Sequence, residues 1–365
     1  MDVTTTRQIQ RAGDYASQIQ VQTLIQNNGI SEGRVHDIVS AACDKAIESC
    51  LMESRLAVEQ RLNSFKDELY VIVGNQLQLF ESLREPSCAA TLGAAANATA
   101  RTNSIADHQM LAELLVKRFE SPSDRHVATG VTKAIEIVEF LTEEGLAGLT
   151  TLYVARAFTP VSGDIKNGIE SLAGLLDVLP LNQLPSGQEW IDDLDILGAV
   201  RYSPIASLVP FLDIQFDQLD GYTVCGVKAD SNDEAEARDR LAQVGLPANL
   251  LVVHELNPGY RRLSLRHTDS FDNLSLYSPS DPSVPHAGLN SDQTEAIRFI
   301  CNLSKDSSCD EVIKGNLKKE MFRYPSLATL ITWWDSIRMA LRLTSVGRCL
   351  ASANARRLKP ELPDF

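Results

Sequence analysis

Two histidines lie beside charged residues in the second half of the chain, in the pairs His254-Glu255 and Arg266-His267. A histidine next to a carboxylate can act as a general base, because imidazole titrates near neutral pH. Nucleophilic catalysis would also need a serine or cysteine against the ring, and the linear spacing places none there. The pairs therefore predict no defined reaction, and we assign no catalytic residue.

Three aspartates, Asp192, Asp193 and Asp195, form a carboxylate cluster that invites interpretation as a metal site. Hard cations such as Ca²⁺ favour carboxylate ligands. However, no glycine follows at the calcium-loop position and no distal glutamate completes the pattern. We favour a solvated helix face, and we expect neither a metal nor another cofactor.

The seven cysteines are scattered and include no CxxC pair; they occupy positions 43, 50, 88, 225, 301, 309 and 349. This spacing fits neither a zinc ribbon nor a disulfide framework, so we expect reduced thiols as in the cytosol. Residues 1–10 lack the apolar core of a signal peptide. The most apolar stretch, residues 327–343, contains Asp335 and Arg338 and is no plain membrane span. The sequence predicts a cytoplasmic protein without membrane contact.

Charge is spread unevenly along the chain. With 34 basic and 48 acidic residues the net charge is -14, which opposes attraction of nucleic acid by the whole molecule. Residues 164–240 carry 15 acidic and 5 basic residues, whereas residues 314–359 have a balance of +8. The candidates for contact with nucleic acid or an acidic partner are Arg348, Arg356, Arg357 and Lys359. Docking onto an acidic surface of the same chain or of a second copy is the less demanding alternative.

The familiar motifs of nucleotide and hydrolytic enzymes are missing, since there is no GxxxxGK[ST], GxGxxG, GxSxG or HExxH. Enzymatic activity is therefore disfavoured. A nuclease or nucleotide hydrolase with a nonstandard site stays an alternative, because sites assemble from distant segments. Loss of metal-dependent cleavage in Asp192→Ala or His254→Ala would favour it.

The N-terminal residues 1–30 form a β-prone segment. Gln-Ile-Gln occurs at residues 8–10 and again at 18–20, with Gly13-Asp14 between them. The alternation of apolar residues with glutamines predicts two short strands, and the Gly-Asp pair predicts a turn. Because a lone hairpin is marginal and glutamine ladders stack well, we expect self-association. The residues expected to carry it are Ile9, Gly13, Gln18, Ile19 and Val21. The alternatives are a disordered tail or an edge strand on the protein's own sheet.

Residues 31–85 predict one long helix, since no proline occurs before Pro86. A heptad stripe runs along it through Val58, Leu62, Phe65, Leu69 and Ile72. A helix of this length exceeds what one small domain covers, so we expect a coiled coil between subunits. The alternative is a helix bundle within one chain.

The remaining residues predict a helical-hairpin domain at 86–220, a small α/β portion at 221–285 and C-terminal helices at 286–365. The first helices expected are 87–104, for which a flexible linker is the alternative, 105–119 and 124–141. Residues 204–219 add another helix, broken or kinked by Pro210. The strands expected are 222–227, 250–254 and 261–266, with a helix at 231–244 after the first. Residues 269–285 predict a loop, and residues 326–358 one long terminal helix with a break near Thr344. The expected fold class is mainly α, with a short N-terminal β segment.

Several short stretches resemble known sequences. Residues 8–20 are similar to the Gly- and Gln-centred motifs of bacterial amyloid-like signalling sequences and of the RIP homotypic interaction motif. Other stretches resemble a poorly characterised bacterial family often encoded beside phage-defence genes. They are Ala12-Gly13-Asp14, Asn28-Gly29-Ile30, residues 111–115 followed by Arg118, residues 133–136 and residues 343–347.

The family resemblance implies a context in host defence or stress and supplies no catalytic residues. We therefore expect an oligomeric scaffold or sensor component that binds copies of itself, or another protein of the same defence system.

Overall fold

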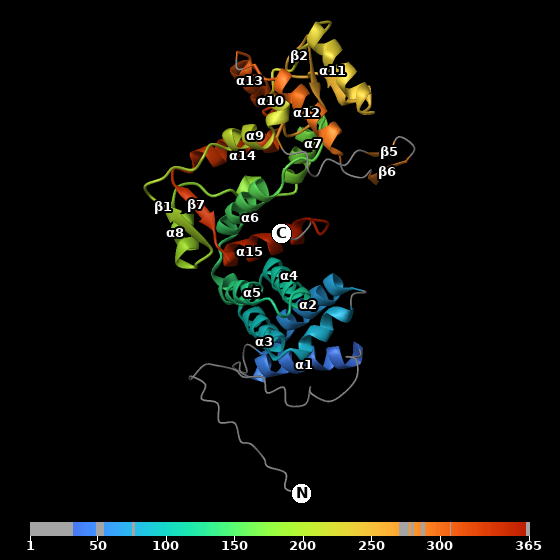
Figure 1. The fold of residues 1–365 in the computed structure, drawn as a ribbon. Helices are drawn as coiled ribbons and strands as arrows, with labels where there is room; N and C mark the ends of the chain where they lie inside the picture. The colour runs from blue at the N-terminus through green and yellow to red at the C-terminus, as the bar shows by residue number, and fades with distance from the viewer. Residues whose placement is uncertain are drawn as a thin grey trace. The chain divides into compact units, whose positions relative to one another are not determined.

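The computed structural model describes residues 32–48, 55–74, 77–269, 277–278, 281–285, 289–306 and 308–362. The chain divides into two units, each built from separated stretches (Figure 1). Unit 1 comprises residues 1–150, 191–201 and 343–365, and unit 2 comprises residues 151–190 and 202–342. The sequence predicted consecutive segments instead, because nothing in linear order indicates that the last helix packs with the first ones.

Unit 1 is a bundle of helices, which confirms the mainly α fold class. Its helices are α1 (Glu32–Glu48), α2 (Arg55–Val73), α3 (Pro86–Arg101), α4 (Ile105–Glu120), α5 (Arg125–Ile137) and α15 (Ser345–Leu358), with 3₁₀ segments at Leu77–Arg84 and Val138–Phe140. Helix α4 packs against α2, α3, α5 and α15, and Figure 1 shows the red α15 beside it. The bundle therefore closes around α4.

Local sequence explains where these helices begin. Pro86 occupies the first turn of α3, where its missing N–H costs nothing. The Ser104 side chain accepts a hydrogen bond from the Asp107 N–H and caps α4, and Asp124 caps α5 in the same way. Residues 87–104 are thus largely helix, as expected, rather than a linker.

The single long helix expected over residues 31–85 is wrong. Helix α1 packs against α2 and α3, so α1 and α2 are not collinear. The imidazole of His36 stacks on the Tyr70 ring with 6.3 Å between centroids, which also sets the two helices side by side. Helix α2 ends at Val73, and Gly74 has a φ of +47°, a conformation that ends a helix and favours glycine.

The heptad stripe lies inside the chain. Val58, Leu62, Phe65 and Leu69 are each at most 3% exposed, and Ile72 is half-buried. They belong to α2, which packs against α3 and α4 of the same unit. The structure therefore assigns the stripe to an intramolecular bundle, and the reason for expecting an intersubunit coiled coil there disappears.

Unit 2 combines helices with a small antiparallel sheet. Helix α6 (Glu143–Ala157) runs from unit 1 into it, and α8 (Glu189–Ile196) returns. The further helices are α7 (Ile165–Leu176), α9 (Phe211–Gln218), α10 (Asp220–Thr223), α11 (Asn232–Gln243), α12 (Ser291–Leu303), α13 (Asp310–Met321) and α14 (Pro325–Ser336), with 3₁₀ turns at Leu181–Gln183 and Ala248–Leu250.

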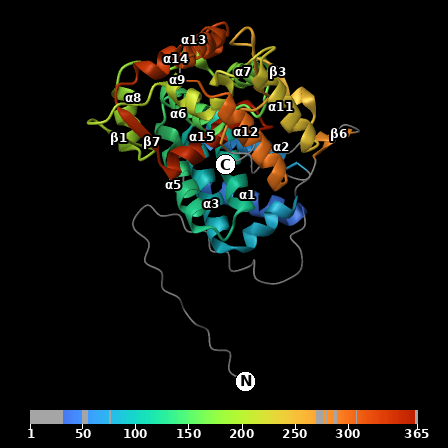
Figure 2. The same cartoon turned by 45° about the horizontal axis from the view of Figure 1, so that its top comes forward.

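The sheet has the strand order β2-β4-β3, formed by Val227–Lys228, Tyr260–Leu263 and Leu251–Val253. Val227 pairs with Arg261, and Leu251 pairs with Leu263. Helices α11 and α12 lie side by side (Figure 2), and both contribute to the core under the sheet. The expected β-α-β-β order is present, but the first strand is shorter than predicted because Tyr222 belongs to α10.

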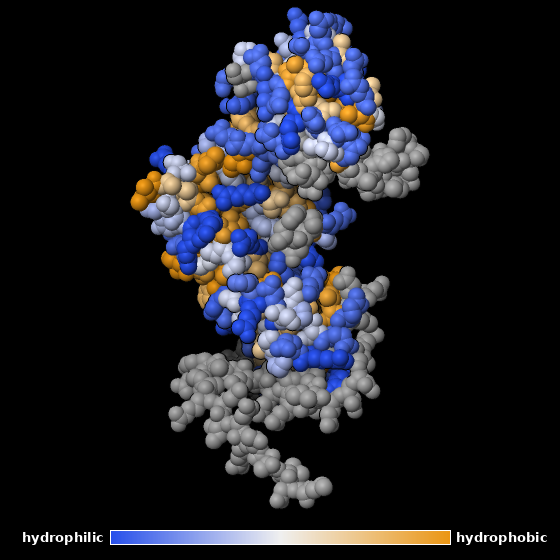
Figure 3. Space-filling view, in the orientation of Figure 1, coloured by the Kyte–Doolittle hydropathy of each residue, from blue (hydrophilic) through white to orange (hydrophobic). Residues whose placement is uncertain are grey.

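Two predicted helices are interrupted. Residues 326–358 form α14, then strand β7 (Ala340–Leu343), then α15, because β7 pairs with β1 (Val200–Ser203). Residues 204–210 are not helical, and α9 starts only after Pro210. In the segment between β1 and α9, the Ile205 side chain is 97% exposed, and the segment shows as an orange surface in Figure 3.

Strands β5 (Tyr277–Ser278) and β6 (Asp281–Pro285) pair within residues 269–285, which the sequence predicted to be a loop.

Candidate functional site

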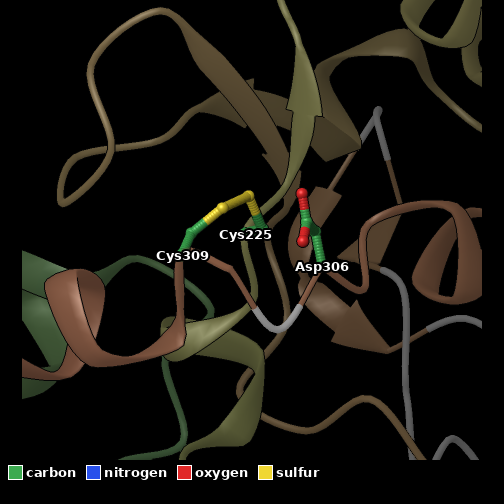
Figure 4. Close-up of side chains that lie close together, drawn as sticks. All are labelled: Cys225, Asp306 and Cys309. Carbon is green, nitrogen blue, oxygen red and sulfur yellow. A yellow bond between two sulfur atoms is a disulfide. The ribbon is translucent and has the colours of Figure 1, made fainter.

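Unit 2 contains a disulfide between Cys225 and Cys309 (Figure 4). The two residues are 84 positions apart in sequence, and their Cα atoms lie 5.6 Å apart. Cys225 precedes β2, and Cys309 is the N-cap residue of α13. The expectation that all cysteines are scattered reduced thiols is wrong for this pair, because folding brings distant segments together.

A carboxylate adjoins the two sulfurs. One ligand atom each of Cys225, Cys309 and Asp306 lies within 4.8 Å of the others, and Figure 4 shows Asp306 beside the disulfide. Asp306 is exposed, and its Oδ1 accepts a hydrogen bond from the Ser308 N–H at 2.9 Å. Hydrogen bonds from the Ser308 side chain and backbone hold the pKa of the Asp306 carboxyl below its ordinary value. A negative charge therefore stands at the sulfur pair.

The sheet holds the Cys225 end of the bond in place. The Asn257 side-chain amide donates to the Cys225 carbonyl oxygen at 2.8 Å. The next residue, Gly226, donates its N–H to the Ser304 carbonyl oxygen at 3.0 Å and has a φ of +82°. A Cβ at Gly226 would lie 2.4 Å from the Arg261 carbonyl oxygen, so only glycine allows this approach of β2 to β4. The segment before α13 is thereby joined to the sheet twice, by Ser304 and by the disulfide.

The other described cysteines are buried thiols: Cys43, Cys88, Cys301 and Cys349. Burial raises the pKa of Cys43 to about 11 and that of Cys301 to about 12, so their reactive thiolate is scarce near neutral pH. Burial also raises the pKa of Cys88. Cys309, in contrast, is half-buried and reaches solvent. Among the described residues, thiol chemistry therefore concentrates at Cys225 and Cys309.

Sequence reasoning missed this site. The cysteine partners are too far apart to form a recognisable motif, and no spacing rule identifies a pair separated by 84 residues. The local signal was the short Asp306-x-x-Cys309 spacing, which puts two ligand types on one turn.

The histidine pairs do not converge into a catalytic site. His254 is 1% exposed, and both ring nitrogens are hydrogen-bonded: Nε2 donates to the Val224 carbonyl oxygen and Nδ1 accepts from the Leu256 N–H. Glu255 pairs with Arg262 at 3.0 Å, and His267 Nδ1 lies 3.1 Å from Asp220. Arg266 hydrogen-bonds to Thr159. These partners give each residue a role in packing.

Two buried histidines predict acid sensitivity. Burial lowers the pKa of His108 and of His254 below the ordinary 6.5, so each ring takes up a proton at a lower pH in the folded protein than in the unfolded chain. Stability is then retained above pH ~6.5 and falls as the pH drops below it, by up to about 1.4 kcal/mol per pH unit for each histidine.

Urea unfolding between pH 8 and 5 measures this slope. We expect His254→Gln to reduce the slope, whereas His126→Gln, on the exposed face of α5, leaves it unchanged. A free energy of unfolding that stays constant down to pH 5 would contradict the lowered pKa values of His108 and His254.

The aspartate cluster is a solvated helix face, as favoured from the sequence. Asp192 and Asp193 are exposed on α8, and Asp195 pairs with Arg201 at 3.0 Å. Among the residues that the structure describes, these three aspartates form no group with the geometry to hold a metal.

The basic candidates on α15 have different surroundings. Arg356 Nε lies 3.1 Å from a carboxylate oxygen of Glu113, which is 6% exposed. Arg357 donates to Asn354, while Lys359 is half-buried and Arg348 is exposed. The predicted β residues Ile9, Gly13, Gln18, Ile19 and Val21 lie outside the described residues. The Glu113–Arg356 pair gives part of the basic tail an acidic partner within the same unit.

We predict that Arg356→Met lowers the free energy of unfolding by about 2–3 kcal/mol, because it leaves the Glu113 carboxylate buried without this cation. The partial exposure of Arg356 keeps the loss below that of a fully buried ion pair. Denaturant unfolding of Arg348→Met, an exposed change on the same helix, is the control and should differ from the parent by less than about 0.5 kcal/mol. Equal losses in both variants would contradict a structural role for Arg356.

The stretches that carry the family resemblance also have structural roles. Glu113 forms the pair above, and Arg118 is 2% exposed and donates to the Ser121 and Pro122 carbonyl oxygens. At Gly347 a Cβ would lie 2.0 Å from the Ala199 carbonyl oxygen. These residues therefore have packing roles in unit 1.

Comparisons with known proteins give a family without a function. No curated protein and no solved structure matches the chain. Among the described residues, no helix is long and apolar enough to span a bilayer. One family model, that of an uncharacterised family, matches residues 29–363. Since this match covers most of the chain, the protein belongs to that family.

Proposed function

We propose that the protein is a sensor component, without catalytic activity of its own, whose unit 2 responds to the redox state of Cys225 and Cys309. One observation carries the proposal. A disulfide that reaches solvent joins segments 84 residues apart, while the other described thiols are buried. In a cytoplasmic protein, which the sequence favours, such bonds are usually transient and redox-sensing.

Reduction would loosen α13. The disulfide fixes the N-terminus of this helix to the segment before β2. Among the described residues, a polar link that remains is the hydrogen bond from the Asn316 side chain to the Leu256 carbonyl oxygen, within the turn before β4. Loss of the covalent link therefore lowers the cost of local opening at this end of unit 2. A partner that binds α13 would therefore respond to this change in local stability.

Hydrogen exchange tests the proposal. The chain is compared oxidised, after reduction by a dithiol, and as Cys309→Ser. We expect faster exchange in residues 222–228 and 305–321 in the last two samples, with unit 1 unchanged. A sensing bond should titrate within the cytosolic glutathione range of about -220 to -320 mV. A bond that a dithiol cannot reduce in the folded protein, or unchanged exchange after reduction, would refute the sensor.

We further propose that the protein is a scaffold that self-associates through residues 1–30, where alternating glutamines and β-branched residues favour stacking against other copies. Because α1 and α2 contribute buried side chains to the core of unit 1, a truncation must stop before Glu32. Light scattering on the full chain and on a variant lacking residues 1–30 measures assembly. Equal monomeric masses would contradict it. The resemblance to proteins encoded near phage-defence genes supports a role in defence.

A further inference from the structure

We propose that reduction converts the Cys225–Cys309–Asp306 cluster into a binding site for a thiophilic divalent cation, Zn²⁺. The ligands are the two Sγ atoms and one carboxylate oxygen of Asp306. This inference rests on the proposed function, because the sulfurs can bind a metal only after the disulfide opens. It adds a ligand to the sensor, so that unit 2 would exist in a disulfide form and a metal form.

The three ligand atoms already lie close together. A tetrahedral zinc with Zn–S bonds of about 2.3 Å separates two sulfurs by roughly 3.8 Å. The Cα atoms of the two cysteines lie 5.6 Å apart, so rotation of their side chains alone can set the sulfurs at this separation once the bond opens. The donor atoms of all three residues lie within 4.8 Å of one another, so the carboxylate is also within reach.

The turn before α13 presents two of the ligands together. The Cys309 N–H donates to the Asp306 carbonyl oxygen at 3.3 Å, which places both residues on one turn. The Ser308 N–H donates to Asp306 Oδ1 and so orients the carboxylate toward the two sulfurs. The third ligand comes from the sheet side, where Asn257 donates to the Cys225 carbonyl oxygen. Loop and sheet therefore both position ligands.

The ligand chemistry selects the cation. Two thiolates favour Zn²⁺ over Mg²⁺ or Ca²⁺, which prefer oxygen ligands. Three protein ligands leave a fourth tetrahedral position for water, as in zinc sites that are not closed. Among the described residues, this is the one cluster of three such ligands.

The interconversion balances with ordinary thiol chemistry. A dithiol gives two electrons and two protons to the Cys225–Cys309 bond, forming two cysteine thiols and its own cyclic disulfide. Zn²⁺ then displaces both thiol protons and forms two Zn–S bonds. In reverse, a small-molecule disulfide accepts two electrons from the thiolates and leaves as two thiols with two protons from solvent, while the protein disulfide reforms and Zn²⁺ is released.

Cobalt substitution tests the site in the full-length protein. Co²⁺ is added to the oxidised chain and to the chain reduced with a phosphine, and absorption spectra report thiolate-to-cobalt charge transfer and tetrahedral geometry. We expect both signals in the reduced protein and neither in the oxidised one. Zinc titration should then displace the cobalt.

Variants assign the ligands. Cys309→Ser should abolish the charge-transfer band, and Asp306→Asn should weaken cobalt binding at least about tenfold, the lower end of what even outer-shell losses cost. Glu311→Gln, an exposed carboxylate outside the cluster, is the matched control and should bind as the parent does.

Absence of the band in the reduced parent, or an Asp306→Asn variant that binds like Glu311→Gln, would overturn the proposed site. Neither result contradicts the redox-sensor proposal if reduction still speeds hydrogen exchange around α13. Conversely, a folded protein that only a phosphine at high concentration can reduce, yet binds cobalt, would sink the sensor and keep the metal site.

Discussion

Reduction of the Cys225–Cys309 bond is expected to lower the free energy of unfolding of unit 2 by about 4–5 kcal/mol. The bond closes a loop between residues 84 positions apart. In the chain-entropy description, releasing a loop of this length returns roughly that much conformational free energy to the unfolded chain. The loss is large against the free energy of unfolding of about 5–15 kcal/mol that is typical of native domains. Denaturant unfolding with and without a phosphine reductant measures it.

Cys309→Ser is the control for this prediction, because it lacks the bond and should show no further loss when reductant is added. Its stability should match that of the reduced parent. A loss below about 1 kcal/mol on reduction would mean that the unfolded chain stays compact without the bond, and that the entropic reasoning does not apply here.

Replacement of Arg262 by Met is expected to destabilise unit 2 by about 3–5 kcal/mol, as for other buried ion pairs that lose one partner. The Arg262 side chain is 0% exposed and donates to both carboxylate oxygens of Glu255. It also donates to the carbonyl oxygens of Gly163, Leu263 and Leu265 and lies 5.5 Å from the Tyr222 ring centre. Methionine fills part of the volume but satisfies none of these acceptors.

The pKa of the Glu255 carboxyl depends on its contacts with Arg262. Its burial would raise the pKa, but the hydrogen bonds and charge of Arg262 outweigh burial and lower it. Arg55→Met is the control, since it breaks an exposed pair with Glu59 on α2 and should cost less than about 0.5 kcal/mol. Urea unfolding measures the loss of unfolding free energy in both variants. Similar losses would show that Arg262 contributes no more than a surface cation.

Periodicity predicted the helices well where one face is apolar and the ends carry caps. Residues 105–119 and 124–141 satisfied both conditions, and α4 and α5 lie where expected. Prediction was wrong where a tertiary partner decides. The heptad stripe of α2 predicts which side chains are buried, but it does not indicate whether they pack against another chain or against α4, because both arrangements bury the same side chains. Residues 340–343 form a strand because β1 lies beside them.

The candidate site shows the same division. The sequence alone determined the mainly α fold, the glutamine-rich head, the acidic middle and the basic tail, because each depends on composition and on neighbours within a few residues. Only the tertiary structure brought Cys225 to Cys309 and Asp306, and Arg356 to Glu113. Those meetings depend on how separated segments pack, which local spacing does not encode. The positions of the ligands therefore follow from the fold, while their chemistry was already present in the residue types.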